Sequence, residues 1–336
     1  MSSAPTADEI TRDATWLAQA LDPSAGMVRL VAMNRDSYRS ASFLDDRLLA
    51  QPIDAQIVPW PDVEAAVTDD MRSDARWIFH IGHVGSTLVS RLLGDIDEVL
   101  ALREPRILRD LALSPSQVRE QYNGAVPKLM SRTFAADETA CVKATSFASE
   151  IATRLVPPGE RQLFMYAKPR MYIATIHAGE NSLKELHGHG EYRRERLAGR
   201  GIFFPEPRND AERAAVAWAC EMTSLEAAAD AMTDRSIAWA DFDVMLEDMS
   251  GELGRVAEFF GFTADPTQLE AIASGPLMQR YSKALEFEYS PSLRNDLIAQ
   301  EFELQGPAID AALAMLCATA EKSPLLERAL RRAEGN

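Results

Sequence analysis

Residues 77–93 read WIFHIGHVGSTLVSRLL, and this stretch decides the fold. Its first part, Trp77–Ile81, is a short apolar run rich in β-forming residues that ends at a glycine, which predicts a buried strand. From Ser86 to Leu93 the apolar residues recur at helical spacing, which predicts a helix. Residues 82–87 (GHVGST) therefore form a glycine-containing loop that leads from a strand into a helix N-terminus.

This loop has the chemistry of a phosphate site. The N-terminus of a helix directs several backbone N–H groups at one point, and these groups bind phosphate oxygens. Gly82 and Gly85 allow the backbone to close on a phosphate without a Cβ in the way. The hydroxyls of Ser86 and Thr87 can cap the helix and donate further hydrogen bonds. We therefore expect the loop to bind a nucleotide that carries phosphate.

Two common nucleotide motifs fit this loop poorly. A Walker A loop requires Gly-x-x-x-x-Gly-Lys-Ser/Thr, and this loop is shorter and has no lysine before its hydroxyls, which argues against an ATPase or a kinase. A dinucleotide fingerprint requires Gly-x-Gly-x-x-Gly, of which only Gly82 and Gly85 are present. Glu104 does lie near the position of a ribose-binding acid, so a dinucleotide site stays open as a weaker alternative.

The rest of the chain alternates short apolar strands with helices. We predict helices from Pro169 to about Leu186 and from Phe242 to Phe262, and a C-terminal part that is mainly helical. Alternating strands and helices imply a three-layer α/β fold of the P-loop type, with helices on both faces of a parallel sheet. The further strands are predicted at Val99–Leu102, Ala140–Ala144, Gln162–Tyr166 and Ser236–Ala240.

Residues 1–75 form a lead-in that we expect to pack on the main domain, residues 76–336, as one structural unit. In this lead-in, Thr6 to Leu21 and Tyr38 to Ala50 are predicted to be helices, and Met27 to Ala32 and Ile57 to Trp60 to be strands. A further helix is expected to begin at Pro61.

The segment HGHGEYRRERLAGR, residues 187–200, is rich in glycine and charge. We interpret it as a mobile surface loop or lid, with a solvated helix face as the alternative. His187 and His189 provide only a two-ligand fragment without a helical partner, so we predict no metal site.

Composition limits the partners. The chain has 336 residues and a formal net charge of −16, which disfavours binding to nucleic acid and to anionic membranes. Small anions are not excluded, because a local cluster of donors can outweigh the average charge. There is no long apolar run and no secretory signal pattern, so we expect a cytoplasmic protein without membrane binding. The three cysteines, Cys141, Cys220 and Cys317, are expected to be reduced and buried.

Several segments together resemble the sulfotransferase superfamily, in order and spacing, over about residues 75–295. FHIGHVGSTLVSRLL is similar to the family's 5′-phosphosulfate loop, with His83 at the position of the usual basic residue. The other segments are LREPRILRDLA (102–112), CVKATSFAS (141–149), FMYAKPRMYIAT (164–175), ADFDVMLEDMSGELGRVAEFFGF (240–262) and LMQRYSKALEFEYSPSLR (277–294).

The resemblance implies a bound co-substrate, 3′-phosphoadenosine 5′-phosphosulfate (PAPS), and suggests roles for individual residues. Glu104 would be the base, His83 would stabilise the leaving phosphate, and Lys143 would face the phosphates or the acceptor. The family has an arginine where this chain has Ala167, so Lys168 or Arg170 would have to supply that charge at the 3′-phosphate. The residues implied to bind the co-substrate are Gly82, His83, Val84, Gly85, Ser86, Thr87, Lys168, Arg170, Thr175, Arg280, Tyr281, Ser282 and Lys283.

The sequence thus predicts a PAPS-dependent sulfotransferase that acts on a hydroxyl or amine of a small molecule or carbohydrate. A non-catalytic nucleotide-binding protein of the same fold and a different nucleotide-dependent phosphotransferase stay open as alternatives. For the single residues there are structural alternatives as well. Glu104 could belong to a surface salt-bridge cluster with its neighbouring arginines, and Lys143 could simply extend its head group to solvent.

Overall fold

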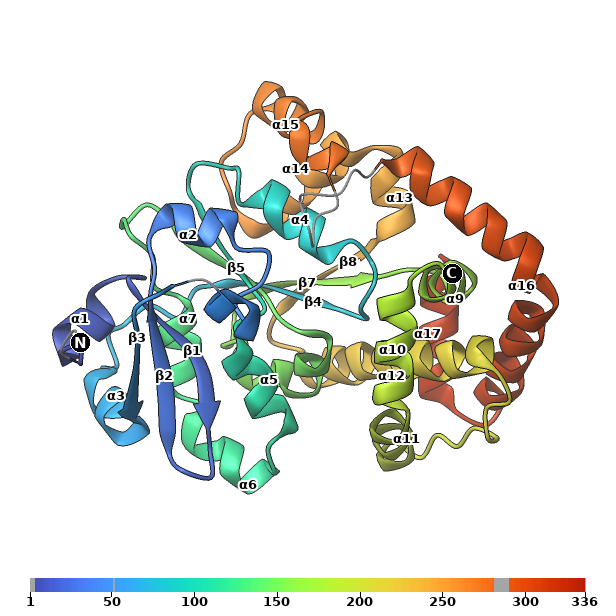
Figure 1. The fold of residues 1–336 in the computed structure, drawn as a ribbon, viewed down its shortest axis with the longest axis horizontal. Helices are drawn as coiled ribbons and strands as arrows, with labels where there is room; N and C mark the ends of the chain where they lie inside the picture. The colour runs from blue at the N-terminus through green and yellow to red at the C-terminus, as the bar shows by residue number, and fades with distance from the viewer. Residues whose placement is uncertain (1–3, 51, 281–289, 336) are drawn as a thin grey trace.

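A five-stranded parallel sheet forms the centre of the computed structural model, which describes residues 4–50, 52–280 and 290–335 (Figure 1). The strand order is β5-β6-β4-β7-β8, so β4 lies in the middle. Every neighbouring pair is parallel. The strands are β4 (Arg76–His80), β5 (Val99–Arg103), β6 (Thr139–Lys143), β7 (Arg161–Tyr166) and β8 (Ser236–Asp241).

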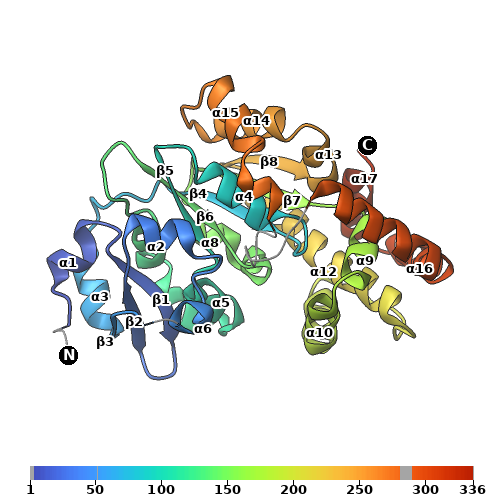
Figure 2. The same cartoon turned by 45° about the horizontal axis from the view of Figure 1, so that its top comes forward.

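Helices cover both faces of this sheet and create three layers. α4 (Ser86–Leu93) and α14 (Met249–Phe260) contact the strands on one face, while α12 (Asp210–Ala231) passes beneath β4 on the other (Figures 1 and 2). Strands β4, β5, β6 and β7 are buried almost without interruption, as expected for a parallel sheet with two covered faces, while the edge strand β8 is mostly only partly buried. The predicted α/β fold class, a three-layer parallel sheet with a mainly helical C-terminal part, is confirmed.

The remaining elements connect and flank these layers. The longest of them, α16, runs along the edge of the molecule on the side away from the N-terminus (Figure 1). The α-helices are α1 (Ala7–Arg12), α2 (Arg35–Ser40), α3 (Trp60–Ala66), α5 (Arg106–Leu113), α6 (Ser116–Arg119), α7 (Ala125–Met130), α8 (Ala152–Leu155), α9 (Pro169–His177), α10 (Glu180–Gly188), α11 (Gly190–Gly199), α13 (Phe242–Glu247), α15 (Pro266–Ala273), α16 (Pro291–Ala320) and α17 (Pro324–Ala333). The 3₁₀ turns are Asp46–Ala50, Glu120–Tyr122, Ser146–Ile151 and Pro276–Gln279.

A second, antiparallel sheet lies near the N-terminus, in the order β1 (Trp16–Asp22), β2 (Met27–Ala32), β3 (Ala55–Pro59). The predicted helix from Thr6 to Leu21 is therefore wrong beyond Arg12. The run Leu-Ala-Gln-Ala-Leu favours a helix by local propensity, but in the fold it is buried and paired with β2. Tertiary pairing outweighs the small propensity differences between these residues.

Three other predicted helices are interrupted. The one expected from Tyr38 to Ala50 ends at Ser40, and a 3₁₀ turn follows only at Asp46. The helix expected from Pro169 is divided into α9 and α10 near Gly179. The helix expected from Phe242 to Phe262 is divided into α13 and α14 at Asp248, whose side chain caps α14. The second helix ends at Phe260, with Gly261 as its C-cap.

Residues 187–200 form helix rather than a surface loop or lid, and one face of α11 is solvated, with Glu191, Arg194 and Glu195 exposed. They complete α10 and form α11, and the side chains of Arg193 and Leu197 are buried. The many arginines suggested solvent exposure, but Arg193, Arg196 and Arg200 pair with carboxylates of neighbouring elements, one of which, Glu221, is buried. Burial of a charge is tolerated when it is paired in this way.

Two buried arginines attach the N-terminal sheet to the parallel one. The Arg103 guanidinium, at the end of β5, donates to the carbonyl oxygens of Tyr38 and Ala41 at the end of α2. The Arg132 guanidinium donates to the carbonyl oxygens of Ile10 and Trp16. Burial lowers the pKa of Arg103 to about 9 and that of Arg132 to about 10, which is the direction expected for cations removed from water.

Cys141 and Cys220 are buried, as predicted, but Cys317 is exposed on α16, and none of the three forms a disulfide. Within the described residues, no helix has both the length and the apolar character needed to cross a membrane.

Candidate functional site

The glycine loop begins where β4 ends, and the buried ring of His80 fixes its start. The backbone N–H of Gly82 donates to Nδ1 of His80 at 2.9 Å. Nδ1 is therefore an acceptor, so Nε2 carries the proton and donates to the carbonyl oxygen of Ala144, also at 2.9 Å. A neutral His80 thus connects the loop to the end of β6, although the sequence patterns did not identify this residue.

The loop is held in a left-handed backbone conformation at three positions. The φ angles are +82° at Gly82, +55° at His83 and +61° at Gly85. A Cβ on Gly85 would lie 2.0 Å from ring atoms of Phe242, so only glycine fits there. His83 is a non-glycine residue with positive φ, which stores backbone strain of the kind that often marks functional sites.

The N-terminus of α4 offers hydrogen-bond donors to the space in front of it. Its N-cap, Gly85, provides no side-chain acceptor. Within the described part of the chain, nothing accepts a hydrogen bond from the backbone N–H of Gly85, Ser86 or Thr87. Thr87 is 2% exposed, and its Oγ1 likewise has no partner among these residues. Buried donors need partners, and a phosphate group would supply acceptors for all of them.

A cavity of about 960 Å³ opens in front of this helix end. All six predicted loop residues line it, together with the predicted residues Glu104, Lys143, Thr175 and Arg280. The other lining residues come chiefly from the N-terminal sheet region, α5, α10 and α16. Those used below are Phe43, His80, Phe147, Ser182, Glu185, His189, Phe242 and Arg294.

Glu104 and Lys143 lie together at the carboxyl ends of adjacent strands. Their positions follow from the register in which Arg103 pairs with Lys143. The Lys143 ammonium, with a side chain only 1% exposed, forms an ion pair with Oε1 of Glu104. The same oxygen lies 3.8 Å from Nε2 of His80. Glu104 has a φ of +53°, so this residue, like His83, holds a strained backbone.

Glu104 does not pair with its neighbouring arginines, and Lys143 does not extend to solvent, although the sequence left both arrangements open. Arg103 binds backbone carbonyls of α2, and Arg106 pairs with Asp46 and Asp110. The partner of Glu104 is therefore Lys143 rather than its arginine neighbours. Lys143 is buried rather than extended into solvent, and its Nζ lies 5.7 Å from the ring centre of Phe43.

His83 contacts α10 and α9. Its Nδ1 lies 3.1 Å from Oγ of Ser182, and its Nε2 lies 3.4 Å from Oε2 of Glu185. The ring also meets the edge of Tyr172, with 6.4 Å between the ring centres. The histidine side chain is 11% exposed, so its ring is held in place rather than mobile in the cavity.

Only some of the residues that the family resemblance implies for a 3′-phosphate line the cavity. Lys168 precedes α9 and is exposed, and Arg170 pairs with Asp310 of α16; neither side chain lines the cavity. Ala167 is buried, and its carbonyl oxygen accepts a hydrogen bond from Trp218. Thr175 does line the cavity. Tyr281, Ser282 and Lys283 lie outside the described residues.

Sequence reasoning missed an arginine on the α16 side of the cavity. Arg294 Nη2 lies 2.7 Å from Oδ1 of Asp243, and its guanidinium lies 5.5 Å from the ring centre of Phe242. Phe242 is the residue that packs on Gly85. Arg294 is the last residue of the sulfotransferase-like segment 277–294, so that segment was the available signal.

His189 was considered only as a metal ligand, yet it lines the cavity beside Phe147, with 5.0 Å between ring centres. Burial, and then the nearby charge of Arg193, lower the pKa of His189. The described residues contain no group of three or more His, Cys, Asp or Glu arranged to hold a metal ion.

No family model matches the chain, and no curated protein matches it in sequence. Among solved structures, the sulfotransferase domain from the curacin biosynthetic pathway is similar with a TM-score of 0.42 and 12% identity, over 66% of this chain and 85% of that domain. A mouse sulfotransferase complexed with PAP is similar with a TM-score of 0.40 and 12% identity, over 77% of this chain and 89% of that one. Both are distant similarities.

Proposed function

We propose that the protein transfers a sulfuryl group from PAPS to a hydroxyl or amine of a small acceptor. The observation that carries the proposal is the shared cavity: the donor-rich end of α4, with the unpartnered Thr87 hydroxyl, opens into the same space as the Glu104–Lys143 pair. An anion site and a carboxylate–ammonium pair in one cavity are what a transfer from a phosphate-linked donor requires.

The loop residues would hold the phosphosulfate end of PAPS. The N–H groups of Gly85, Ser86 and Thr87 and the Thr87 hydroxyl would donate to its oxygens, and His83 adds an N–H donor. The cations nearest to the rest of the nucleotide would be Arg280 and Arg294, because both line the cavity and Lys168 and Arg170 do not. This assignment replaces the arginine that the family resemblance expects at Ala167.

Bound PAPS would supply a sulfuryl group attached to the oxygen of a good leaving group. Glu104 would accept the proton of the acceptor hydroxyl while the acceptor oxygen forms its bond to sulfur. The bond between sulfur and the bridging phosphate oxygen breaks, and its electron pair remains on that oxygen. Lys143 and His83 would stabilise the negative charge that develops there.

A second function, nucleotide binding without catalysis, is favoured by one observation. Oε1 of Glu104, which a general base would need free to accept a proton, is already engaged in the ion pair with the Lys143 ammonium. The two functions agree on the nucleotide and differ on turnover, so one set of measurements separates them.

The first test is ligand-dependent stability. We expect PAPS and its product, adenosine 3′,5′-bisphosphate (PAP), to raise the melting temperature. A ligand at a hundred times its Kd adds about 2.7 kcal/mol, which a thermal scan detects easily. Stabilisation by ATP or NAD with no effect of PAPS or PAP would contradict the proposed nucleotide.

The second test is PAP release from PAPS with a panel of alcohols, phenols, sugars and amines. We expect acceptor-dependent release that falls about 10²- to 10⁴-fold in Glu104→Gln, the usual range for loss of a general base. PAP affinity should stay within a few-fold of wild type in that variant. PAP binding without release from any acceptor class would favour the non-catalytic function.

A further inference from the structure

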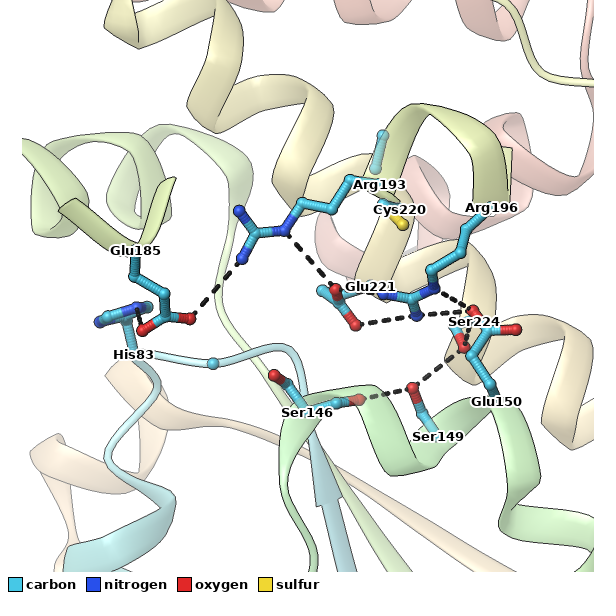
Figure 3. A network of polar contacts seen from close by, with 12 residues as sticks. His83, Ser146, Ser149, Glu150, Glu185, Arg193, Arg196, Cys220, Glu221 and Ser224 are labelled. Carbon is cyan, nitrogen blue, oxygen red and sulfur yellow. Dashed lines mark hydrogen bonds and ion pairs between the residues drawn. The ribbon is translucent and has the colours of Figure 1, made fainter. Parts of the chain in front are cut away.

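His83 contacts α10 through both ring nitrogens, Nδ1 with Ser182 and Nε2 with Glu185. Figure 3 shows the contact with Glu185. The Glu185 carboxylate can only accept a hydrogen bond, so its position 3.4 Å from Nε2 favours a proton on that nitrogen. The Ser182 hydroxyl can either donate to Nδ1 or accept from it, because a hydroxyl has both functions. The site therefore favours a proton on Nε2 and accommodates His83 either as a neutral ring or as a cation.

Glu185 is in turn held by a buried arginine. Its Oε1 lies 3.6 Å from Nη2 of Arg193, and the arginine side chain is 5% exposed. Nε of Arg193 lies 3.8 Å from Oε1 of Glu221 on α12. The two contacts place Arg193 between two carboxylates of different helices, so a buried positive charge faces Glu185 from the side away from His83.

The contacts continue inward as alternating charges. Arg196 binds both oxygens of Glu221, at 2.7 and 3.1 Å, and also binds Glu150, at 2.6 Å. Arg200 binds Glu150 at 2.7 Å. We name the whole set the buried charge network after its three buried members, Arg193, Arg196 and Glu221. The set also includes Glu150, Glu185 and Arg200, which are partly exposed.

The buried charge network contains three glutamates and three arginines, so its formal charges cancel. A protonated His83 adds one positive charge at the edge of this set, on the side of the cavity. An anion bound at the loop would balance that added charge. The network thus provides a stable, neutral support on which the charge of His83 can change.

We propose that Glu185, held by Arg193, is a positioning residue that keeps His83 in place and favours its protonated form, so that the loop binds anions more tightly when His83 takes up a proton. The inference rests on the proposed nucleotide site. A histidine at position 83 differs from a lysine, because its positive charge would be present at low pH and reduced at high pH.

The other groups that face His83 do not give the same pH dependence. On α9, Tyr172 is completely buried, which raises the pKa of its phenol well above the usual value, so it stays neutral. On α11, Arg193 remains a cation throughout the physiological range. At the end of α10, His189 titrates in the same cavity, but burial and Arg193 lower its pKa. A His189→Gln background removes this second imidazole from the measurement.

The proposal is tested first on the full chain without nucleotide, by following the imidazole resonances in an NMR titration and assigning His83 with a His83→Gln variant. We expect Glu185→Gln to move the midpoint of the His83 titration down by about one pH unit, because an opposite charge at this range favours the cation. Glu185→Asp, which keeps the charge, should recover part of the shift. Glu180→Gln, on the exposed side of the same helix, is the matched control and should leave the midpoint unchanged.

The second readout is the Kd of PAP between pH 5.5 and 8.5. We expect wild-type affinity to fall as pH rises through the His83 midpoint, and Glu185→Gln to lose up to about tenfold at neutral pH, the equivalent of one pH unit. An unchanged His83 midpoint in Glu185→Gln overturns the positioning role. A shifted midpoint with a pH-independent PAP Kd overturns the coupling to anion binding. Absence of PAP binding at every pH, with the midpoint still shifted, overturns the proposed nucleotide instead.

Discussion

The phosphate loop and the helices beside it use different groups to stabilise charge. Residues 82–87 carry no formal charge apart from that of a protonated His83, and they present backbone N–H groups and the buried hydroxyls of Ser86 and Thr87. The α10–α12 side instead holds six ionised side chains that neutralise one another, of which Arg193, Arg196 and Glu221 are buried. Backbone donors need only a particular chain conformation, whereas buried ions need every partner in position. We therefore expect the loop to be destabilised mainly by substitutions that add atoms, and the charged helices mainly by substitutions that remove a charged partner.

The largest effect should come from removing a partner in the buried charge network. Arg196→Met leaves Glu221, whose side chain is 1% exposed, without its bidentate partner. Breaking a buried ion pair on one side typically costs about 3–5 kcal/mol. Chemical denaturation should detect this loss. Arg194→Met is the matched control on the same helix, because its pair with Glu206 is exposed and its loss should stay within about 1 kcal/mol. Equal losses in the two variants would contradict the role of burial.

The next largest effect should come from adding a single methyl group to the loop. Gly85→Ala places a Cβ against the Phe242 ring at a positive φ, and we expect about 2–4 kcal/mol lower stability. We also expect the Kd of PAP to rise by more than tenfold. Gly82→Ala is the control, since an added Cβ there would meet no atom within 4 Å and only the backbone conformation is strained, at about 1 kcal/mol. A loss in Gly82→Ala as large as in Gly85→Ala would mean that steric contact with Phe242 is unimportant.

A smaller effect should follow from Thr87→Val, which removes a hydroxyl and keeps the shape. Because Oγ1 has no partner among the described residues, the variant should be as stable as wild type or more stable. The Kd of PAP should rise about tenfold, since a hydrogen bond to a charged group contributes about 1.5 kcal/mol or more. Calorimetric titration with PAP gives the affinity, and unfolding of the ligand-free protein gives the stability. An unchanged affinity would exclude the hydroxyl from the phosphate site.

The smallest effect should be seen in how the free energy of unfolding decreases at low pH. Burial alone would raise the pKa of Glu150, but Arg196 and Arg200 outweigh it, so the folded-state pKa lies below the usual 4.5. A lowered folded pKa means that the contribution is present above pH 4.5 and is lost as pH falls through the folded value. Glu150→Gln should therefore show a weaker decline of unfolding free energy between about pH 4.5 and 3 than wild type. Parallel declines would contradict the ion pairs of Glu150.

These two regions also differ in how far sequence predicts them. The loop, α4 and the strands of the parallel sheet follow from local patterns, since a glycine loop after an apolar run has few other conformations. The Ser86–Leu93 helix has the bounds that the periodicity indicated. The positions of Glu104 and Lys143 at one sheet edge follow from the same alternation of strands and helices.

The buried charge network could not be predicted in the same way. An arginine-rich run is usually solvated, and only the three-dimensional arrangement of α11 against α12 shows that Arg193 and Arg196 have buried carboxylate partners. His80 and Arg294 were also missed, because a histidine inside a strand and an arginine at the start of a long helix have no distinguishing local pattern. The helix–strand error at residues 13–22 has a related cause, since pairing with β2 decides the outcome there.

Arg103 has a consequence for how this chain folds as it is synthesised. Its backbone belongs to β5, next to Glu104, while its guanidinium satisfies the carbonyl oxygens at the end of α2. The N-terminal sheet region emerges from the ribosome first, yet these carbonyls have their partner only after residue 103 has followed and β5 has joined β6. We therefore expect the first 75 residues alone to lack a stable fold. The N-terminal region should become ordered together with the carboxyl ends of β5 and β6, where Glu104 and Lys143 lie.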